Sequence, residues 1–131
     1  MQQRLGDDLD YDGMVGTDWG IQSRMYWGVE DGKGYTTAYR ILCGMLAGID
    51  QQGGYSTLSV MKEAYDMGVN GSTEFGIDPL GEDYMNALVD KSATRVLKII
   101  FNLGMFENPY ADPDYAEKFV GSNALNQEAY E

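Results

Sequence analysis

Hydrophobic residues recur along the chain at two spacings, which predict short strands alternating with helices. A short apolar run over residues 14–17 is typical of a buried strand, and residues 49–52 form a second, very short extended segment. Over residues 35–47, 56–69 and 82–103 the apolar residues are three or four positions apart, as on one face of a helix. This alternation predicts a parallel sheet, so the expected fold class is α/β and helix-rich.

Capping residues indicate where these helices begin and end. Thr36 or Thr37 is suited to cap the first helix, and Gly48 to end it in a left-handed conformation. Ser56 is suited to cap the second helix, and Gly104 to end the third. A last helix is expected to start near residue 122 or 123. The faces expected to be buried comprise Ala38, Ile41, Leu42, Met45 and Leu46 in the first helix, Leu58, Met61, Tyr65 and Val69 in the second, and Met85, Leu88, Val89, Ser92, Val96, Ile99, Ile100 and Leu103 in the third.

The composition excludes several classes of chemistry. The 131 residues are 44% hydrophobic and 23% charged, so the chain can bury a core. Lys and Arg number 9 and Asp and Glu 21, a net charge of −12, so we expect no nucleic-acid partner. The lack of His excludes Ser-His-Asp and Cys-His catalysis and His-ligated metals, and the single Cys43 cannot form an internal disulfide. We therefore expect no metal site of that kind and no cofactor.

The remaining candidates for chemistry are carboxylates, backbone groups and aromatic rings. No apolar run approaches the roughly 18 residues that a membrane span needs, so we expect no membrane partner. The first six residues lack the apolar core of a secretion signal, and this pattern does not define a cellular compartment. The 10 Tyr and 2 Trp suit a surface that contacts sugar rings.

Asp18 follows the first predicted strand, and Asp50 lies in the second. Because folds with parallel strands place their active sites at the carboxyl ends of those strands, Asp18 is a candidate functional carboxylate. The alternative is that Asp18 only caps the next turn. Trp19 is suited either to stack on a sugar ring or to pack as a core aromatic residue. Asp50 ends the second strand and either faces the same cleft or pairs structurally.

An acidic segment near the N-terminus matches the first half of a calcium-binding loop. Asp8, Asp10 and Asp12 followed by Gly13 fit the pattern D-x-D-x-D-G of the EF-hand. The twelfth position, which should hold a bidentate acid, is Trp19. The alternatives are a calcium loop and a solvated acidic turn.

Three segments in one order resemble glycoside hydrolase family 3, which includes β-glucosidases and β-xylosidases. The family patterns are G-F-D-G-x-V-x-[ST]-D-W, A-G-x-D, and R-[IV]-L followed by L-G-L-F-E-N-P-Y. The matching segments are DYDGMVGTDWG at residues 10–20, AGID at residues 47–50, RVL at residues 95–97 and FNLGMFENPY at residues 101–110. The departures are Tyr11 in place of Phe, Gly16 in place of a β-branched residue, and the polar residues 51–54 in place of an apolar run.

The resemblance implies a (β/α) barrel followed by an α/β sandwich domain. Residues 1–106 would form the C-terminal portion of the barrel domain, its last strand–helix units, and residues 107–131 a linker towards a second domain absent from the chain. Because a full barrel takes about 250 residues, we expect a partial (β/α) barrel. Apolar helix faces left exposed in such a fragment predict self-association.

The resemblance also implies the activity of a retaining glycoside hydrolase, similar to a β-glucosidase, on a β-linked oligosaccharide or glycoside. Retention needs two carboxyl groups about 5–5.5 Å apart, one a nucleophile and one an acid/base. Asp18 corresponds to the family's nucleophile, and Trp19 and Asp50 to substrate-binding residues. The family's acid/base usually lies beyond the barrel, so we expect this chain to lack it and to be inactive alone. Full-length members of the family are often periplasmic or secreted.

Other residues and another function remain open. Glu30 and Asp31, in the loop after the nucleophile strand, are candidates for a substitute acid, and the alternative for both is a solvated loop. Arg95 is expected to be a structural ion-pair partner. The alternative function is a non-catalytic module that binds calcium, or that binds carbohydrate through Trp19 together with Tyr26 and Trp27.

Overall fold

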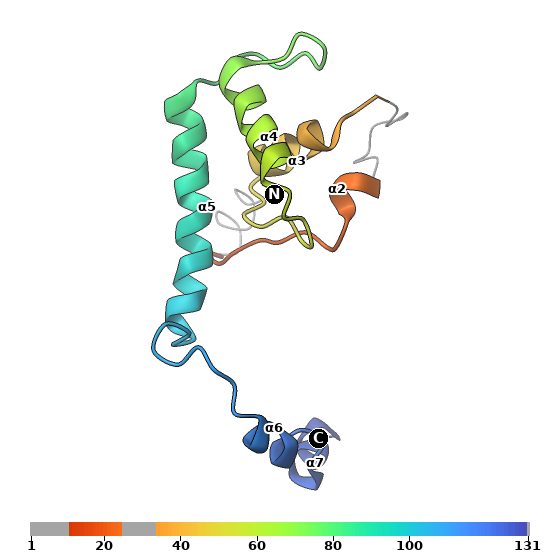
Figure 1. Ribbon diagram of the computed structural model, residues 1–131, viewed down its shortest axis with the longest axis vertical. Coiled ribbons are helices and arrows are strands. Elements are labelled where there is room, and N and C mark those ends of the chain that lie inside the picture. Colours follow the sequence, from red (N-terminus) through yellow and green to blue (C-terminus); the bar gives the residue numbers. More distant parts are fainter. Residues whose placement is uncertain (1–10, 25–33, 131) are drawn as a thin grey trace. The chain divides into compact units, whose positions relative to one another are not determined.

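The computed structural model describes residues 11–24 and 34–130 (Figure 1). The chain divides into two compact units, Met1–Ile99 and Ile100–Glu131, which we describe separately. The predicted boundary between residues 106 and 107 concerns the domains of a larger protein and stays a prediction. The helices of the first unit are α2 (Ile21–Arg24), α3 (Thr37–Leu46), α4 (Leu58–Asn70) and α5 (Glu82–Asn102), the last of which continues into the second unit.

The two predicted strands are reduced to one parallel bridge. Gly16 pairs with Gln51, and no strand longer than this single bridge occurs among the described residues. The Asp50 N–H donates to the Val15 carbonyl at 2.8 Å, and the Thr17 N–H donates to the Gln51 carbonyl at 3.0 Å. The parallel pairing of these segments is thus present, but the predicted short strands are wrong, because the pairing is limited to a single bridge. Within the part of the chain that the structure describes, each segment pairs with one other segment, which is too few for a stable sheet. The partial barrel stays a prediction.

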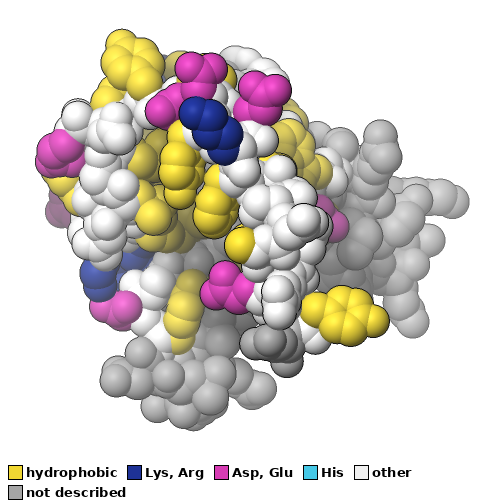
Figure 2. Space-filling model, turned by 90° about the horizontal axis from the view of Figure 1, so that it is seen from below, with side chains coloured by type: hydrophobic (Ala, Val, Ile, Leu, Met, Phe, Trp, Pro, Cys, Tyr) yellow, Lys and Arg dark blue, Asp and Glu magenta, His cyan; other side chains and the backbone are white. Residues whose placement is uncertain are grey.

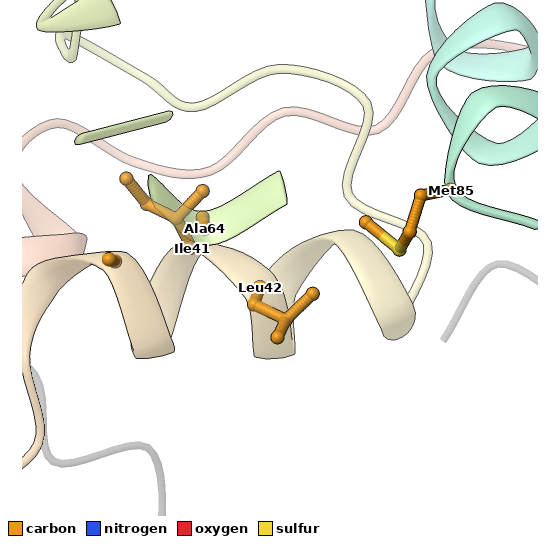
Figure 3. Packing of buried hydrophobic residues seen from close by; sticks show 5 residues of the cluster. Ile41, Leu42, Ala64 and Met85 are labelled. Carbon is orange, nitrogen blue, oxygen red and sulfur yellow. The ribbon is translucent and has the colours of Figure 1, made fainter. Parts of the chain in front are cut away.

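The core lies where α3, α4 and the start of α5 meet. Ile41 and Leu42 of α3, Ala64 of α4 and Met85 of α5 are buried and gather in one cluster (Figure 3). Gly68 allows α5 to approach, because a Cβ atom there would lie 2.6 Å from the Met85 sulfur. The predicted face of α3 is largely confirmed, although Leu46 is exposed. On α4 the centre of the buried face is Ala64, which the predicted stripe omits.

The long apolar row of α5 is only partly buried, so the prediction of a fully buried row is wrong. Met85 is the buried residue of the row, whereas Val89, Ile99 and Leu103 are 41%, 37% and 68% exposed. The reason is that α5 reaches the core only through its first turns. Figure 2 shows hydrophobic side chains lying among acidic and uncharged ones on the face that it draws. Self-association through such a row stays a prediction.

Most predicted helix ends are confirmed. The Thr36 hydroxyl accepts from the Tyr39 N–H at 3.1 Å at the start of α3, and Gly48 follows that helix with φ of 88°. The cap of α4 differs, because Thr57 rather than Ser56 precedes the helix and makes no side-chain capping bond. The polar segment before α5 contains an antiparallel bridge between Ser72 and Ile77 that the sequence did not predict.

The second unit contains two short helices, α6 (Pro113–Phe119) and α7 (Asn123–Tyr130). The start of α7 was predicted, whereas α6 was not. Asp112 caps α6 by accepting from the Asp114 N–H at 3.0 Å and the Tyr115 N–H at 3.1 Å. An Asp before Pro113 is a helix-start signal, and it could have revealed this helix. Tyr115 and Phe119 stack one turn apart, with ring centroids 5.5 Å from each other.

No helix of residues 11–24 and 34–130 is long and apolar enough to cross a membrane.

Tyr39 gives the folded chain a pH dependence in alkaline solution. Its ring stacks on Tyr35 at 4.7 Å, and burial, followed by the hydrogen bond with Cys43, raises the Tyr39 pKa from 10.0 to about 12. Because the unfolded chain releases this proton first, stability should be undiminished below pH 10 and fall as pH rises from 10 towards 12. Urea unfolding at several pH values should show this fall, and Tyr39→Phe should reduce it. The exposed Tyr130→Phe is the control; an equal reduction in both variants would contradict the assignment.

Candidate functional site

The candidate site forms where the two bridged segments end. The segment of residues 14–17 runs into a turn that carries Asp18 and Trp19, and the parallel segment of residues 49–52 runs into a glycine turn. The Gly53 N–H donates to the Thr17 hydroxyl at 2.8 Å, and the Gly20 N–H donates to the Gly53 carbonyl at 3.3 Å. These bonds fix the two turns side by side.

The contact between the two turns requires glycine at both positions of the second turn. A Cβ atom on Gly53 would lie 2.3 Å from the Thr17 carbonyl oxygen and 3.0 Å from the Asp18 carbonyl oxygen. A Cβ atom on Gly54 would lie 2.3 Å from Cε3 of Trp19, and Gly54 has a φ of 64°. The indole of Trp19 therefore lies directly against the backbone of Gly54.

The side chains of Asp18 and Trp19 are both exposed. The backbone N–H of Trp19 donates to Oδ1 of Asp18 at 2.7 Å, which holds the carboxylate over its own turn. Trp19 is 81% exposed although its ring contacts Gly54, so much of the indole surface is available to solvent. An exposed carboxylate beside an exposed aromatic ring can meet the polar and the apolar side of one sugar. The catalytic role of Asp18 and the sugar-binding role of Trp19 stay predictions.

Asp50 is held by two protein groups. Its Oδ2 accepts from the Val15 N–H at 2.9 Å, and its Oδ1 pairs with Nη1 of Arg95 at 3.1 Å. The Asp50 side chain is 1% exposed and that of Arg95 is 16% exposed. The prediction that Arg95 is an ion-pair partner is confirmed. The assignment of Asp50 as a substrate ligand stays a prediction.

A buried polar cluster, which the sequence did not predict, lies next to the turns. Gln22 of α2 is fully buried, and Gln52 is 7% exposed. The Gln22 Nε2 donates to the Thr17 hydroxyl at 2.9 Å and to Oε1 of Gln52 at 2.8 Å. The backbone carbonyl of Gln22 accepts from Nη1 of Arg40 in α3 at 3.2 Å. Glutamines at these positions look like ordinary surface residues in the sequence, so no pattern marked them.

The calcium pattern lies mostly outside the described residues, which include Asp12 but not Asp8 or Asp10. Asp12 pairs with Lys98 of α5, and this cation lowers the Asp12 carboxyl pKa through its hydrogen bond and its charge. The described parts of the chain contain no cluster of three or more potential metal-ligating side chains. The calcium hypothesis stays a prediction.

Four further predicted residues, Tyr26, Trp27, Glu30 and Asp31, lie outside the described residues.

A separate apolar groove of about 430 Å³ runs between α5 and the ends of α3 and the second bridged segment. Asp50 and Gln52 lie at this groove, whereas Asp18 and Trp19 are not among the residues that line it. Three residues of the α5 row, Val89, Ser92 and Val96, contribute to one wall of the groove. The lining residues are Met45, Ile49, Asp50, Gln52, Met61, Val89, Ser92, Ala93, Val96 and Leu97.

Proteins named β-glucosidase are similar to most of this chain. A probable β-glucosidase C of Aspergillus oryzae is 33% identical over 129 residues, which cover 91% of this chain and 18% of the relative. A β-glucosidase C of Emericella nidulans is 32% identical over 128 residues, covering 90% and 18%. A periplasmic β-glucosidase/β-xylosidase of Dickeya chrysanthemi is 32% identical over 97 residues, covering 74% and 12%.

These similarities concern one part of much larger proteins. The chain spans about 18% of the length of the fungal relatives that it matches. No model of a known protein family matches the chain. The chain is therefore related in sequence to a segment of proteins named β-glucosidase.

Proposed function

We propose that this chain represents the nucleophile-bearing segment of a retaining β-glycosidase of glycoside hydrolase family 3, acting on a β-linked glycoside. The similarity to proteins named β-glucosidase supports a hydrolase of this kind. The Asp18–Trp19 turn carries the proposal, because it presents an exposed carboxylate and an exposed indole together at the end of a parallel segment.

In the proposed reaction, an Asp18 carboxylate oxygen attacks the anomeric carbon of the sugar. The bond from that carbon to the leaving oxygen breaks, and a glycosyl ester of Asp18 forms. Water then cleaves the ester. The hydrogen bond from the Trp19 backbone N–H to Oδ1 supports this role, since it restrains the orientation of the carboxylate.

Trp19 is proposed to contact the apolar side of the sugar through its exposed surface. Its contact with Gly54 would fix the ring plane relative to Asp18. Asp50 and Arg95 would support the same turn from inside, because Asp50 also binds the N–H of Val15, three residues before Asp18.

The general acid is proposed to come from a part of the relatives that this chain does not match. Departure of an ordinary alcohol requires a proton, whereas dinitrophenolate leaves as a stable anion without one. A chain with the nucleophile but no acid should therefore hydrolyse simple aryl β-glucosides and β-xylosides negligibly, yet still react with an activated reagent.

The decisive experiment uses a β-glucoside with a dinitrophenolate leaving group and with fluorine in place of the hydroxyl next to the anomeric carbon. The fluorine slows hydrolysis of the ester, so the glycosyl chain should accumulate. We expect mass spectrometry of the intact chain to detect one added fluoroglucosyl group, and peptide mapping to place it on Asp18.

Asp18→Asn should abolish this labelling, because an amide does not replace the carboxylate as a nucleophile. Asp78→Asn, a change to an exposed acidic residue outside the site, should leave it unchanged. Label on other carboxylates, or equal labelling of Asp18→Asn, would contradict the proposed nucleophile. Wild-type chain that stays unlabelled at saturating reagent would contradict it as well.

A further inference from the structure

The side-chain amide of Gln22 joins the two bridged segments that carry the candidate site. Its Nε2 donates both to the Thr17 hydroxyl and to Oε1 of Gln52. Thr17 immediately precedes Asp18, and Gln52 precedes the glycine turn against which Trp19 packs. One buried side chain therefore contacts both chain segments just before each enters its turn.

The backbone of Gln22 is held in place by its own helix and by α3. Gln22 lies in α2, four residues after Asp18, and its backbone carbonyl accepts from Arg40 of α3. The Thr17 hydroxyl that receives the Gln22 bond also accepts from the Gly53 N–H. The cluster thus connects α2, α3 and both bridged segments, and a displacement of Gln22 would displace the two turns together.

The burial of Gln22 is not explained by stability alone. The side chain is 0% exposed, and its Oε1 has no hydrogen-bond partner among residues 11–24 and 34–130. A buried acceptor without a partner costs free energy, and an apolar side chain of the same shape would avoid that cost. Buried polar groups do, however, impose a specific geometry on the segments that they join.

We infer that Gln22 is a positioning residue for the Asp18 carboxylate and the Trp19 indole. It fixes the Thr17 and Gln52 segments relative to each other and thereby sets where the two side chains lie. This inference rests on the proposed function for its catalytic meaning, whereas the geometric effect of Gln22 does not depend on it.

Gln22→Met keeps the length of the side chain and removes its hydrogen bonds. We expect the labelling rate of Asp18 at saturating activated glucoside to fall by roughly tenfold to a hundredfold, as small displacements of reacting groups do. In NMR measurements on the full chain, hydrogen exchange of the backbone N–H groups of Gly53 and Trp19 should become faster. Ala64→Gly is the control, because it loosens the buried core in α4 without touching this cluster.

The control should lower the melting temperature while leaving the labelling rate and both exchange rates close to wild type. Gln22→Met with unchanged labelling and unchanged exchange would overturn the inference, and so would an equal effect of Ala64→Gly. If the wild-type chain is not labelled at all, the proposed function fails, and the exchange rates alone decide whether Gln22 positions the turns.

A second pair of variants keeps the test decisive if Gln22→Met does not fold. Thr17→Val removes the hydroxyl that receives the Gln22 bond, whereas Thr17→Ser retains it. Faster exchange of the Trp19 backbone N–H in Thr17→Val than in Thr17→Ser would support the inference, and equal Trp19 exchange in the two would overturn it. The Gly53 N–H is left out of this comparison, because Thr17→Val removes its own acceptor.

Discussion

Replacing Arg95 with Met is expected to lower the free energy of unfolding by about 3–5 kcal/mol, the usual cost of breaking a buried ion pair. The partner, Asp50, has a side chain only 1% exposed, so removing the guanidinium leaves a carboxylate charge with little access to water. A loss of this size is large beside the roughly 5–15 kcal/mol that stabilises an ordinary domain. Urea unfolding followed by circular dichroism measures it.

The same helix provides the control for this prediction. Lys98 lies three residues after Arg95 and pairs with Asp12, but the two side chains are 50% and 82% exposed. Lys98→Met should therefore cost at most about 1 kcal/mol, as exposed pairs do. Asp50→Asn combined with Arg95→Met should recover part of the loss, because no buried charge remains. Similar costs for Arg95→Met and Lys98→Met would show that burial of the Asp50 pair is not what matters.

Replacing Gly53 with Ala is expected to separate the two turns of the candidate site. The added Cβ would lie 2.3 Å from the Thr17 carbonyl oxygen, which is backbone and cannot rotate away as a side chain would. We expect a loss of about 1–3 kcal/mol in stability, the usual cost of overpacking. The Trp19 N–H should exchange faster with solvent in NMR measurements, because the turn that supports its ring moves.

Gly16→Ala is the matched control in the opposite segment. A Cβ atom there would meet its nearest neighbour, the Gln51 carbonyl oxygen, at 3.8 Å, an ordinary contact. This variant should change stability by no more than about 0.5 kcal/mol. Comparable losses in Gly16→Ala and Gly53→Ala would contradict the argument that close backbone contact at Gly53 determines the site.

The sequence predicted the helices better than the pairing between segments. Helices α3, α4, α5 and α7 were predicted, because their apolar spacing and capping residues are local signals. The short helix α2 was missed because its four residues are too few for any periodicity. The strands failed for the opposite reason, since an apolar run indicates burial but not how many neighbours will pair with it.

The candidate site was predictable in part. Asp18 and Trp19 were identified from their position after an apolar segment and from a family resemblance, and both lie exposed on one turn. The contacts of Asp50 could not be read from spacing, because its partner Arg95 is 45 residues away. Gln22 was missed because its role depends on three segments that meet only in the folded chain.

The exposed apolar row of α5 sets conditions for handling this chain. At neutral pH we expect the net charge of −12 to oppose association through the partly exposed Val89 and Ile99 side chains, by electrostatic repulsion. Acidification towards the isoelectric point near pH 4.1 removes that repulsion while leaving the hydrophobic surface unchanged. We therefore expect colloidal stability to depend on the acidic composition, so dilute, mildly alkaline buffers of low ionic strength should suit purification.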